Sequence, residues 1–351
     1  MKMAKKLQKE KLQFSEIRPS SWNSDQLCPL LGRIRGKRIL VIGDVGLDRY
    51  TIGSVERISP EAPVPVVLVQ EEKLKLGLAA NVADNIQSLG GIPLLLGVVG
   101  QDRGADDFRE LLLHSQIKTS YLVTDSSRRT ALKDRVVSDR QQLVRIDYES
   151  LHPIEEKIEK QVLKKFRDLL PDVDGVVVED YAKGLLTYHL LKTIFKESKQ
   201  AGKFVGVDPN LKTPAEYYRG ATLLTPNTKE AEALSGIFIR DPKSLIQAGT
   251  AILQSSRASH VVVTRGKEGM AIFAQGSSRV RLIPTYAREV YDVSGAGDTV
   301  ISVLVLTLLS GAHIEEAAVL SNLAAGVEVG KRGTATVSTQ EIEAAMTFFR
   351  P

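Results

Sequence analysis

Short runs of Val, Ile and Leu recur along the chain, and each ends in polar or turn-forming residues. They occur at 38–44, 92–100, 175–180, 203–209, 221–227 and 260–266. Strands that are buried on both faces have this pattern. The polar residues that close the runs are Asp44, Asp180, Asp208, Asn227 and Thr264.

Helical periodicity fills the segments between these runs, at 79–89, 105–115, 154–170 and 186–202. Strands that alternate with helices form βαβ units, so the pattern predicts an α/β fold with a mainly parallel sheet between two layers of helices. Ligands bind at the carboxyl ends of the strands in such sheets. We therefore expect the polar residues that close the runs to lie along that edge.

Two stretches break the alternation, at 62–76 and 130–149, and both read as strands. Helical segments separate them from the core strands, so they predict a small antiparallel β lid with strands within about 50–76 and 129–149. A projecting lid has exposed edges that can pair with a second subunit. We therefore expect a homodimer that forms through the lid.

The net charge of +5 is concentrated at the amino terminus. Residues 1–38 contain ten Lys/Arg and three Asp/Glu, which leaves 37 of the 47 basic and 39 of the 42 acidic residues for the rest of the chain. A nucleic-acid groove needs basic residues spread through the fold, so we expect no nucleic-acid partner. The pattern predicts a basic, poorly ordered extension over residues 1–26 and one domain over residues 27–351.

The only cysteine is Cys28, which excludes an internal disulfide and is typical of a reducing compartment. No apolar run reaches the length of a membrane-spanning helix. The basic start also lacks the apolar region of a signal peptide. We therefore expect a cytoplasmic protein that does not bind a membrane.

The segment 290–311, VYDVSGAGDTVISVLVLTLLSG, joins a turn of small residues to an apolar helix. The unpaired amides at such a helix start, here Gly295, Ala296 and Gly297, can bind a phosphate. Asp298 follows them and has two interpretations. It is a helix N-cap, or it is a general base within about 3 Å of a substrate hydroxyl, and both roles can hold together.

The sequence DVSGAGD resembles the second signature of the PfkB, or ribokinase-like, carbohydrate kinases, and the resemblance continues in order over about residues 38–340. It implies a three-layer α/β/α sandwich and ATP-dependent phosphorylation of a sugar hydroxyl. It also implies that Asp298 is the catalytic base and that the amides of residues 295–297 form an anion hole. A site for a monovalent cation such as K⁺ would lie near Asp292.

The segment 76–91, LGLAANVADNIQSLGG, is similar to the first signature of that family. The similarity implies that Gly77 and Asn81 contact the sugar. Leu78 stands where the family usually has a second glycine. Read by itself, Asn81 is a capping or first-turn residue of a helix.

Three later segments resemble the nucleotide-binding elements of the family, at 225–234, 263–270 and 321–334. The implied nucleotide-binding residues are Asn227, Glu230, Thr264, Gly266, Gly269, Asn322 and Gly333. In the N-x-x-E element, Asn227 and Glu230 organise Mg²⁺ around the ATP phosphates, because phosphoryl transfer depends on positioning and charge neutralisation. Read by itself, Glu230 is an acid in the first turn of a helix.

The segments 41–67, 140–149 and 180–184 resemble the kinase portion of bacterial enzymes that phosphorylate O1 of D-glycero-D-manno-heptose 7-phosphate on the route to ADP-heptose and lipopolysaccharide. Arg140 departs from the usual pattern of that group. Carboxylates can accept hydrogen bonds from sugar hydroxyls, and Arg or Lys can bind the 7-phosphate. The candidate substrate-binding residues are Asp44, Asp48, Gly77, Asn81, Arg57, Arg135 and Lys183.

Other functions remain open at this stage. The chain could be a PfkB kinase for fructose, for another sugar phosphate or for a nucleoside, or a non-catalytic sugar-binding module. The combination of Asp298, Asn227 and Glu230 favours an enzyme. None of the five histidines forms the H-x-G-H motif of the adenylyltransferase that is fused to many heptose kinases, so we expect a separate nucleotidyltransferase to act on the product.

Overall fold

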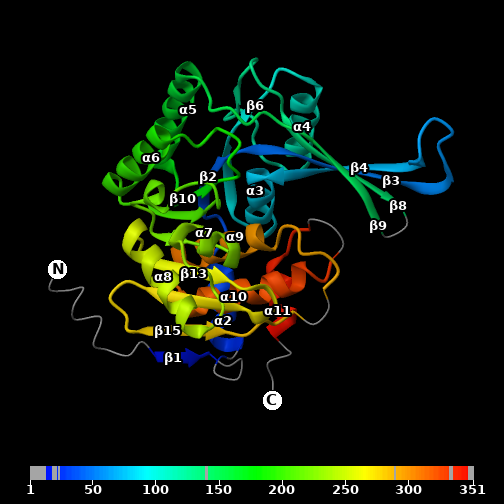
Figure 1. Cartoon of the computed structure of the whole chain (residues 1–351). Helices are drawn as coiled ribbons and strands as arrows, with labels where there is room; N and C mark the ends of the chain where they lie inside the picture. Colours follow the sequence, from blue (N-terminus) through cyan, green and yellow to red (C-terminus); the bar gives the residue numbers. More distant parts are fainter. Residues whose placement is uncertain are drawn as a thin grey trace.

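The computed structural model describes residues 13–17, 22, 24–138, 141–287, 290–331 and 335–346, which form a layered body with a projecting arm of strands (Figure 1). The main sheet has nine strands in the order β1-β15-β14-β13-β12-β11-β10-β2-β5. Its strands are β1 (Gln13–Glu16), β2 (Arg38–Gly43), β5 (Ile92–Leu96), β10 (Gly175–Glu179), β11 (Phe204–Asp208), β12 (Leu223–Leu224), β13 (His260–Thr264), β14 (Met270–Ala274) and β15 (Arg279–Ile283). All neighbours pair in parallel except β14, which is antiparallel to β13 and β15.

Helices cover both faces of this sheet. One layer contains α2 (Ser24–Arg33), α3 (Ala79–Ser88), α4 (Arg103–His114), α9 (Ala296–Leu309), α10 (Ile314–Glu328) and α11 (Thr339–Met346). The other contains α5 (Glu156–Leu169), α6 (Tyr188–Gln200), α7 (Thr228–Ser235) and α8 (Pro242–Ser256). The predicted three-layer α/β/α arrangement is therefore confirmed.

The core consists of two hydrophobic clusters, one on each face of the sheet. In β2, Ile39 and Val41 belong to one cluster and Leu40 and Ile42 to the other, because successive side chains of a strand point to opposite faces. All four are completely buried. This double burial explains why the strand contains no alternating polar residues.

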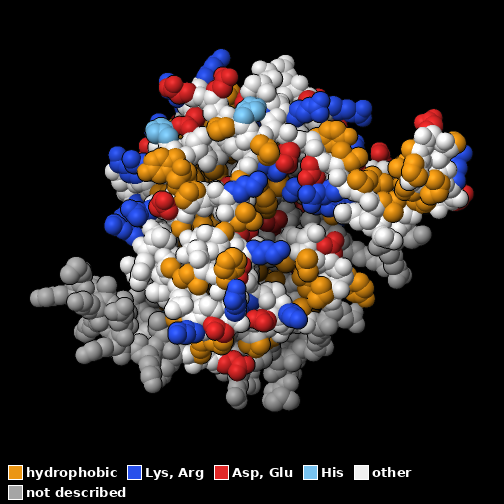
Figure 2. All heavy atoms as spheres, viewed as in Figure 1, with side chains coloured by type: hydrophobic (Ala, Val, Ile, Leu, Met, Phe, Trp, Pro, Cys, Tyr) orange, Lys and Arg blue, Asp and Glu red, His pale blue; other side chains and the backbone are white. Residues whose placement is uncertain are grey.

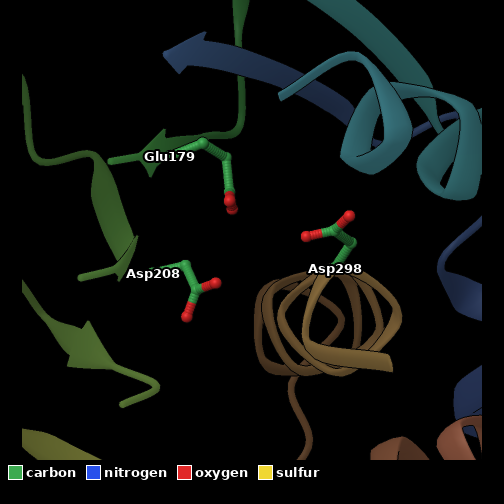
Figure 3. Close-up of side chains that lie close together, drawn as sticks. All are labelled: Glu179, Asp208 and Asp298. Atoms are coloured by element: carbon green, nitrogen blue, oxygen red, sulfur yellow. The ribbon is translucent and has the colours of Figure 1, made fainter. Parts of the chain in front are cut away.

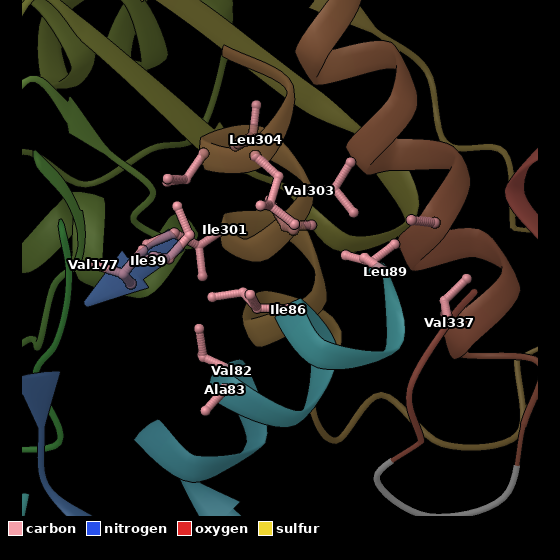
Figure 4. Packing of buried hydrophobic residues seen from close by; sticks show 14 of the residues in the cluster. Ile39, Val82, Ala83, Ile86, Leu89, Val177, Ile301, Val303, Leu304 and Val337 are labelled. Carbon is pink, nitrogen blue, oxygen red and sulfur yellow. The ribbon is translucent and has the colours of Figure 1, made fainter. Parts of the chain in front are cut away.

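Helix α9 lies inside the first layer, between the sheet and its neighbours α3 and α10 (Figure 4). Ile301 packs beside Ile86 of α3 and Ile39 of β2, and nearly the whole helix is buried. A helix that is buried on all sides needs apolar residues all round. This environment accounts for the apolar run TVISVLVLTLL. Because α9 packs against the sheet and against two helices, the position of its first turn is fixed at the edge of the sheet.

A four-stranded lid projects from the body (Figure 1). Its order is β4-β3-β8-β9, with β3 (Val45–Ile58), β4 (Pro65–Leu78), β8 (Ala131–Ser138) and β9 (Gln141–Tyr148). The pairs β3–β4 and β8–β9 are antiparallel, but β3 and β8 are parallel. The predicted small lid is therefore confirmed, but its sheet is mixed and not antiparallel throughout, because the first strands of two hairpins pair in parallel.

Two smaller points complete the fold. The short strands β6 (Val98–Val99) and β7 (Val123–Thr124) form a separate parallel pair. Regular structure begins earlier than the predicted boundary at residue 27, since β1 pairs with β15 and α2 starts at Ser24. Among the described residues, no helix combines the length and the apolar character that crossing a bilayer would require.

Candidate active site

Three carboxylates meet where two core strands end and α9 begins (Figure 3). Glu179 is the last residue of β10, Asp208 is the last residue of β11, and Asp298 lies in the first turn of α9. One oxygen from each carboxylate lies within 4.8 Å of the others. The edge predicted from the polar strand ends therefore holds a compact acidic cluster.

Asp298 is held by residues from two other elements. Asn81 Nδ2 donates to its Oδ2 at 2.6 Å, and the Tyr181 hydroxyl donates to its Oδ1 at 2.8 Å. The N-cap of α9 is Gly295, which has a left-handed φ of 96°, and Asp298 is the third helical residue. The interpretation of Asp298 as the N-cap is therefore wrong, because its carboxylate accepts hydrogen bonds from other segments.

Burial sets the proton affinity of Asp298. Its side chain is 8% exposed, and desolvation raises the pKa of the carboxyl from 3.8 to about 6, while the hydrogen bonds from Asn81 and Tyr181 oppose that rise. The resulting pKa suits a group that accepts a proton near neutral pH. Tyr181 was not among the candidates, although it lies in the segment 180–184 whose resemblance to the heptose kinases could have pointed to it.

The turn before Asp298 faces the acidic cluster. A Cβ at Gly297 would lie 3.7 Å from Asp208 Oδ2, so the first turn of α9 passes beside that carboxylate. Amides in a first helical turn have no acceptor within their own helix. The predicted anion hole of Gly295, Ala296 and Gly297 thus lies next to the acids, with the Ala296 N–H pointing to the Val293 carbonyl at 3.4 Å.

Glu179 is a site residue that sequence reasoning did not identify, and Asp208 was expected at this edge as a polar strand end without an assigned role. Glu179 is completely buried, and neither of its carboxylate oxygens has a hydrogen-bond partner in the described structure. Burial, reinforced by the charge of Asp208, raises the pKa of Glu179 well above its usual value. Burial and the charge of Glu230 likewise raise the pKa of Asp208, which accepts a hydrogen bond from Thr225 Oγ1 at 2.9 Å.

The sugar-side candidates gather under the base of the lid. Asp48 of β3 is 5% exposed and accepts a hydrogen bond from Arg135 Nη1 at 2.7 Å. Gly77 of β4 lies directly beneath it, because a Cβ at Gly77 would lie 3.0 Å from Asp48 Oδ2. Asn81 follows in the first turn of α3. These residues therefore reach one location beside Asp298.

Asp44 and Lys183 occupy the neighbouring end of β2. Asp44 accepts the backbone N–H groups of Lys183 at 3.0 Å and Leu185 at 3.2 Å. Burial raises the pKa of Asp44 to about 6. The Lys183 ammonium forms an ion pair with Glu149. Asp44 thus anchors the loop after β10, while Lys183 lines an open pocket together with Asp44, Arg128, Arg129 and Ser150.

Arg57 lies far from these residues within one chain. It is exposed near the distal end of β3, opposite Val66, nine residues beyond Asp48. At about 3.3 Å per residue, this separation is roughly 30 Å. The structure therefore does not bring Arg57 to the candidate site of its own chain.

The N-x-x-E residues form a reciprocal capping box at the start of α7. Asn227 Oδ1 accepts the Glu230 N–H at 3.0 Å, and a Glu230 carboxylate oxygen accepts the Asn227 N–H at 2.8 Å. The interpretation of Glu230 as an acid in the first turn of a helix is therefore confirmed. Glu230 also lies close enough to Asp208 to raise its pKa, so capping holds this acid next to the acidic cluster.

The remaining nucleotide candidates lie along the same edge. Thr264 ends β13 and forms an isolated bridge with Asn227. Gly266 and Gly269 flank the tight turn after it, with φ of 54° and 81°. Asn322 of α10 donates from Nδ2 to the Pro284 carbonyl at 2.8 Å. Gly333 lies outside the described residues.

The cation candidate Asp292 lies in the loop before the GAGD turn. Its Oδ1 accepts the Ser294 N–H at 2.9 Å, and its own N–H points to the Val329 carbonyl at 3.3 Å. Glu328 lies near it and is completely buried, and this burial raises the pKa of Glu328 to about 8. The loop is thus bound to the end of α10 beside a second acidic group.

Comparisons with known proteins match most of the chain. The model described as pfkB family carbohydrate kinase matches residues 37–341. The chain is 45% identical over 309 residues to "Bifunctional protein HldE" of Geobacter sulfurreducens and 42% identical over 308 residues to "Bifunctional protein HldE" of Helicobacter hepaticus. Each match covers 88% of this chain and 63% of the relative, so the chain spans less than two thirds of their length.

Solved structures support the fold. The ribokinase of Arabidopsis thaliana, complexed with ribose and ATP, aligns with a TM-score of 0.70 at 18% identity and covers 90% of this chain and 99% of its own. The phosphofructokinase-2 of Escherichia coli, in complex with potassium, aligns with a TM-score of 0.73, also at 18% identity, with the same coverage. The predicted ribokinase-like fold is therefore confirmed.

Proposed function

Because this chain belongs to the pfkB family of carbohydrate kinases, we propose that it transfers the γ-phosphoryl group of ATP to the anomeric O1 of D-glycero-D-manno-heptose 7-phosphate. The product would be the 1,7-bisphosphate, a precursor of ADP-heptose for lipopolysaccharide synthesis. The similarity to the two HldE proteins supports this assignment over the match to residues 37–341. A nucleotidyltransferase is expected to act on the product.

One observation carries the proposal. The Asp298 carboxylate lies at the start of a helix, next to two further acids and within hydrogen-bond distance of Asn81 and Tyr181. A general base must lie within hydrogen-bond reach of the hydroxyl that it deprotonates. Asp48, with Gly77 beside it, lies near Asp298 on the sugar side, and the turn 295–297 directly precedes Asp298.

In the proposed mechanism, Asp298 takes the proton from O1 as that oxygen attacks the γ-phosphorus, and the bond to the ADP oxygen breaks on the opposite side. Asn81 and Tyr181 hold the carboxylate in place by donating to separate oxygens. The amides of residues 295–297 donate to the transferred phosphoryl group. Preorganised donors of this kind stabilise charge that develops in the transition state.

The acidic cluster fits Mg²⁺. Carboxylate oxygens are the ligands that Mg²⁺ prefers, and the buried Glu179 carboxylate without a partner is costly unless a cation or proton neutralises it. We assign Mg²⁺ to Glu179 and Asp208, with Glu230 and Asn227 beside them. The ion would neutralise charge on the ATP phosphates. We also assign a monovalent cation such as K⁺ to the Asp292 loop.

The direct test is the Asp298→Asn variant. Loss of general-base catalysis should lower kcat by about 10²- to 10⁴-fold while the thermal unfolding transition stays cooperative. Asp106→Asn is a matched control, since Asp106 is an exposed acid in the first turn of α4. Near-normal turnover by Asp298→Asn would remove Asp298 from the mechanism.

The substrate is tested separately by ADP release from a panel of sugars. Heptose 7-phosphate should give the highest kcat/KM among heptose, fructose, their phosphates and a nucleoside. NMR of the product should place the new phosphate on C1. A preference for fructose or a nucleoside would leave the family intact and defeat the heptose assignment, whereas binding without turnover would favour a sugar-binding module.

We also propose that two chains pair through the lid. Its exposed hydrophobic side chains are Ile58, Val64, Leu68, Val69, Val144 and Ile146. Hydrophobic side chains lie along the projecting arm in the space-filling view (Figure 2), and exposed apolar patches of this kind mark interaction surfaces. Light scattering should give twice the chain mass, and Leu68→Asp, at a position 63% exposed, should shift it toward one chain. A single-chain mass for the unaltered protein would refute the dimer.

A further inference from the structure

The lid carries a row of cations on the face that looks toward the acidic cluster. Strand register pairs Asp48 with Lys133 on β8 and with Lys75 on β4, so these side chains share one face. The next positions of the same face are occupied by Tyr50, Arg135, Lys73 and Arg145. Asp48 and Asp147 share this face, so the underside of the lid carries both signs of charge with an excess of cations, while the strand ends below it are acidic.

Most of these cations already have a carboxylate partner. Arg135 pairs with Asp48 at 2.7 Å, and Lys73 pairs with Glu71 at 3.0 Å. Farther out, Arg145 pairs with Asp147 at 2.9 Å, and across the pocket Lys183 pairs with Glu149. Lys133 forms no ion pair within the part of the chain that the structure describes.

Lys133 lies close to the candidate base. Its Nζ lies 5.6 Å from the centre of the Tyr181 ring, and the hydroxyl of that ring donates to Asp298 at 2.8 Å. Burial is the main influence on the pKa of Asp298, and the positive charge of Lys133 lowers that pKa slightly. Lys133 therefore lies over the sugar side of the base.

Lys133 lies two residues after Ala131 on β8, and Ala131 lines the pocket that contains Lys183. Burial lowers the pKa of the Lys133 ammonium, the charge of Asp48 opposes this change, and the charge of Lys183 adds to it. A half-buried cation without a carboxylate partner is costly, and this cost disappears when an anion enters beside it.

We propose that Lys133 binds the second anionic group of the substrate, a phosphate monoester on the sugar carbon remote from the hydroxyl that is phosphorylated. This inference rests on the proposed function and names the residue that makes it selective for a sugar phosphate. A phosphate monoester carries nearly two negative charges at neutral pH, and a lysine ammonium binds it as a point charge. Lys183, Arg129 and Ser150 line the pocket next to it and complete the subsite.

The competing role for Lys133 is purely electrostatic support of Asp298. That role would affect sugars with and without the remote phosphate equally, because the base acts on the anomeric hydroxyl of both. A role in phosphate recognition affects only the phosphorylated sugar. The difference between the two ligands therefore separates the two roles.

The experiment measures binding of D-glycero-D-manno-heptose 7-phosphate and of unphosphorylated D-glycero-D-manno-heptose by titration calorimetry. Lys133→Met should weaken binding of the 7-phosphate by about 10- to 100-fold, the usual effect of losing a charged hydrogen bond. Binding of the unphosphorylated sugar should change by less than about 3-fold. Lys133→Arg, which keeps the charge, should restore most of the affinity for the 7-phosphate.

Lys73→Met is the matched control, because Lys73 lies on the same face of the lid and already pairs with Glu71. It should leave both affinities within about 2-fold of the unaltered protein. Cooperative thermal unfolding of every variant shows that the lid is folded. An equal loss for both sugars in Lys133→Met, or a loss of the same size in Lys73→Met, would overturn the inference.

The outcome is distinguishable from failure of the proposed function. If the unaltered protein binds the 7-phosphate more tightly than the free sugar and Lys133→Met removes the difference, the subsite stands even when another sugar phosphate is the better substrate in the ADP-release panel. If the unaltered protein binds both ligands equally, the subsite is refuted, whatever the turnover.

Discussion

Asn81 Nδ2 lies 2.6 Å from Asp298 Oδ2 and joins the first turn of α3 to the first turn of α9. One turn farther along, Thr299 Oγ1 donates to Asn85 Oδ1 at 3.0 Å, and all four side chains are buried. The two contacts hold the helices in a fixed relative position. The candidate base therefore has a fixed direction before any substrate binds.

The pH dependence of activity should follow the protonation of Asp298. The base acts only when it is ionised, so kcat/KM of the free enzyme should fall as the pH drops through about 6, where its pKa lies. The Tyr181 hydroxyl donates to the ionised carboxylate and lowers that pKa. Tyr181→Phe should therefore move the acid limb of the pH–rate profile to higher pH.

Tyr218→Phe provides the control for this shift. Tyr218 is completely buried, and its hydroxyl donates to Asp180 at 2.7 Å, not to Asp298. Its replacement should leave the acid limb unchanged even if the protein becomes less stable. Equal shifts in both variants would show that the limb reports general loosening of the fold and not this hydrogen bond.

Glu179→Gln should stabilise the metal-free protein at neutral pH. The pKa of Glu179 is raised above its unfolded value of 4.5, so its unfavourable contribution to folding is absent below pH 4.5 and grows as the pH rises above it. The free energy of unfolding of the variant should exceed that of the unaltered protein by about 1–3 kcal/mol, which is the usual cost of a buried polar group without a partner. Denaturant unfolding of both proteins in EDTA, at about pH 5 and pH 8, should show that the stability advantage of the variant is larger at the higher pH.

The same variant should raise the Mg²⁺ concentration needed for half-maximal turnover, since it removes a negative charge and a proposed Mg²⁺ ligand from the acidic cluster. Glu159→Gln is the matched control. Glu159 is 9% exposed, but its carboxylate accepts from Thr187 and contacts His189. Its replacement should destabilise the protein and leave the Mg²⁺ dependence alone. A destabilised Glu179→Gln protein would contradict this account.

The turn after β13 should tolerate a methyl group at one glycine and not at the other. A Cβ at Gly269 would lie 1.9 Å from the Ile283 carbonyl oxygen, and its φ is 81°. Gly266 has a φ of 54° with no atom within 4 Å of the added carbon. Gly269→Ala should cost roughly 3 kcal/mol or more, and Gly266→Ala about 1–2 kcal/mol, in denaturant unfolding. Similar costs for both would show that the turn relaxes.

Leu78 occupies a backbone conformation that favours glycine, with φ 57° and ψ −140°. Such strain costs about 1–3 kcal/mol, and burying the leucine side chain returns a similar amount. The free energy of unfolding of Leu78→Gly should therefore lie within about 1 kcal/mol of that of the unaltered protein. Leu76→Gly is the control, because Leu76 is equally buried at 6% exposure without a positive φ, and it should cost about 3–5 kcal/mol.

Local sequence patterns were sufficient for the parallel core. The runs that became β2, β10 and β13 are apolar on both faces, and their polar ends mark the functional edge because all parallel strands end there. The unexpected strand β1 shows the limit of this approach. It pairs with β15, whose residues lie 266 positions away along the chain, and no local periodicity encodes that contact.

The sequence did not reveal Glu179 or Lys133, because their place in the site depends on the direction of their side chains. Glu179 and Asp180 are adjacent, and only Asp180 was singled out, yet Glu179 points into the acidic cluster while Asp180 accepts from Tyr218 and Thr213. Successive residues of an extended chain point to opposite sides. Register between strands decides which side faces the ligand. The same rule concealed Lys133, which faces the site only because β8 pairs with β3 as it does.

The lid and the core sheet share one continuous piece of backbone. β2 ends at Gly43 and β3 begins at Val45, so the arm extends a strand that lies inside the core sheet. Gly43 is paired in register with Glu179, and a Cβ there would lie 2.3 Å from the Glu179 carbonyl oxygen. If two chains pair through the lid as proposed, a shift of the arm would therefore reach the strand end beside Glu179, one of the two residues proposed to hold Mg²⁺.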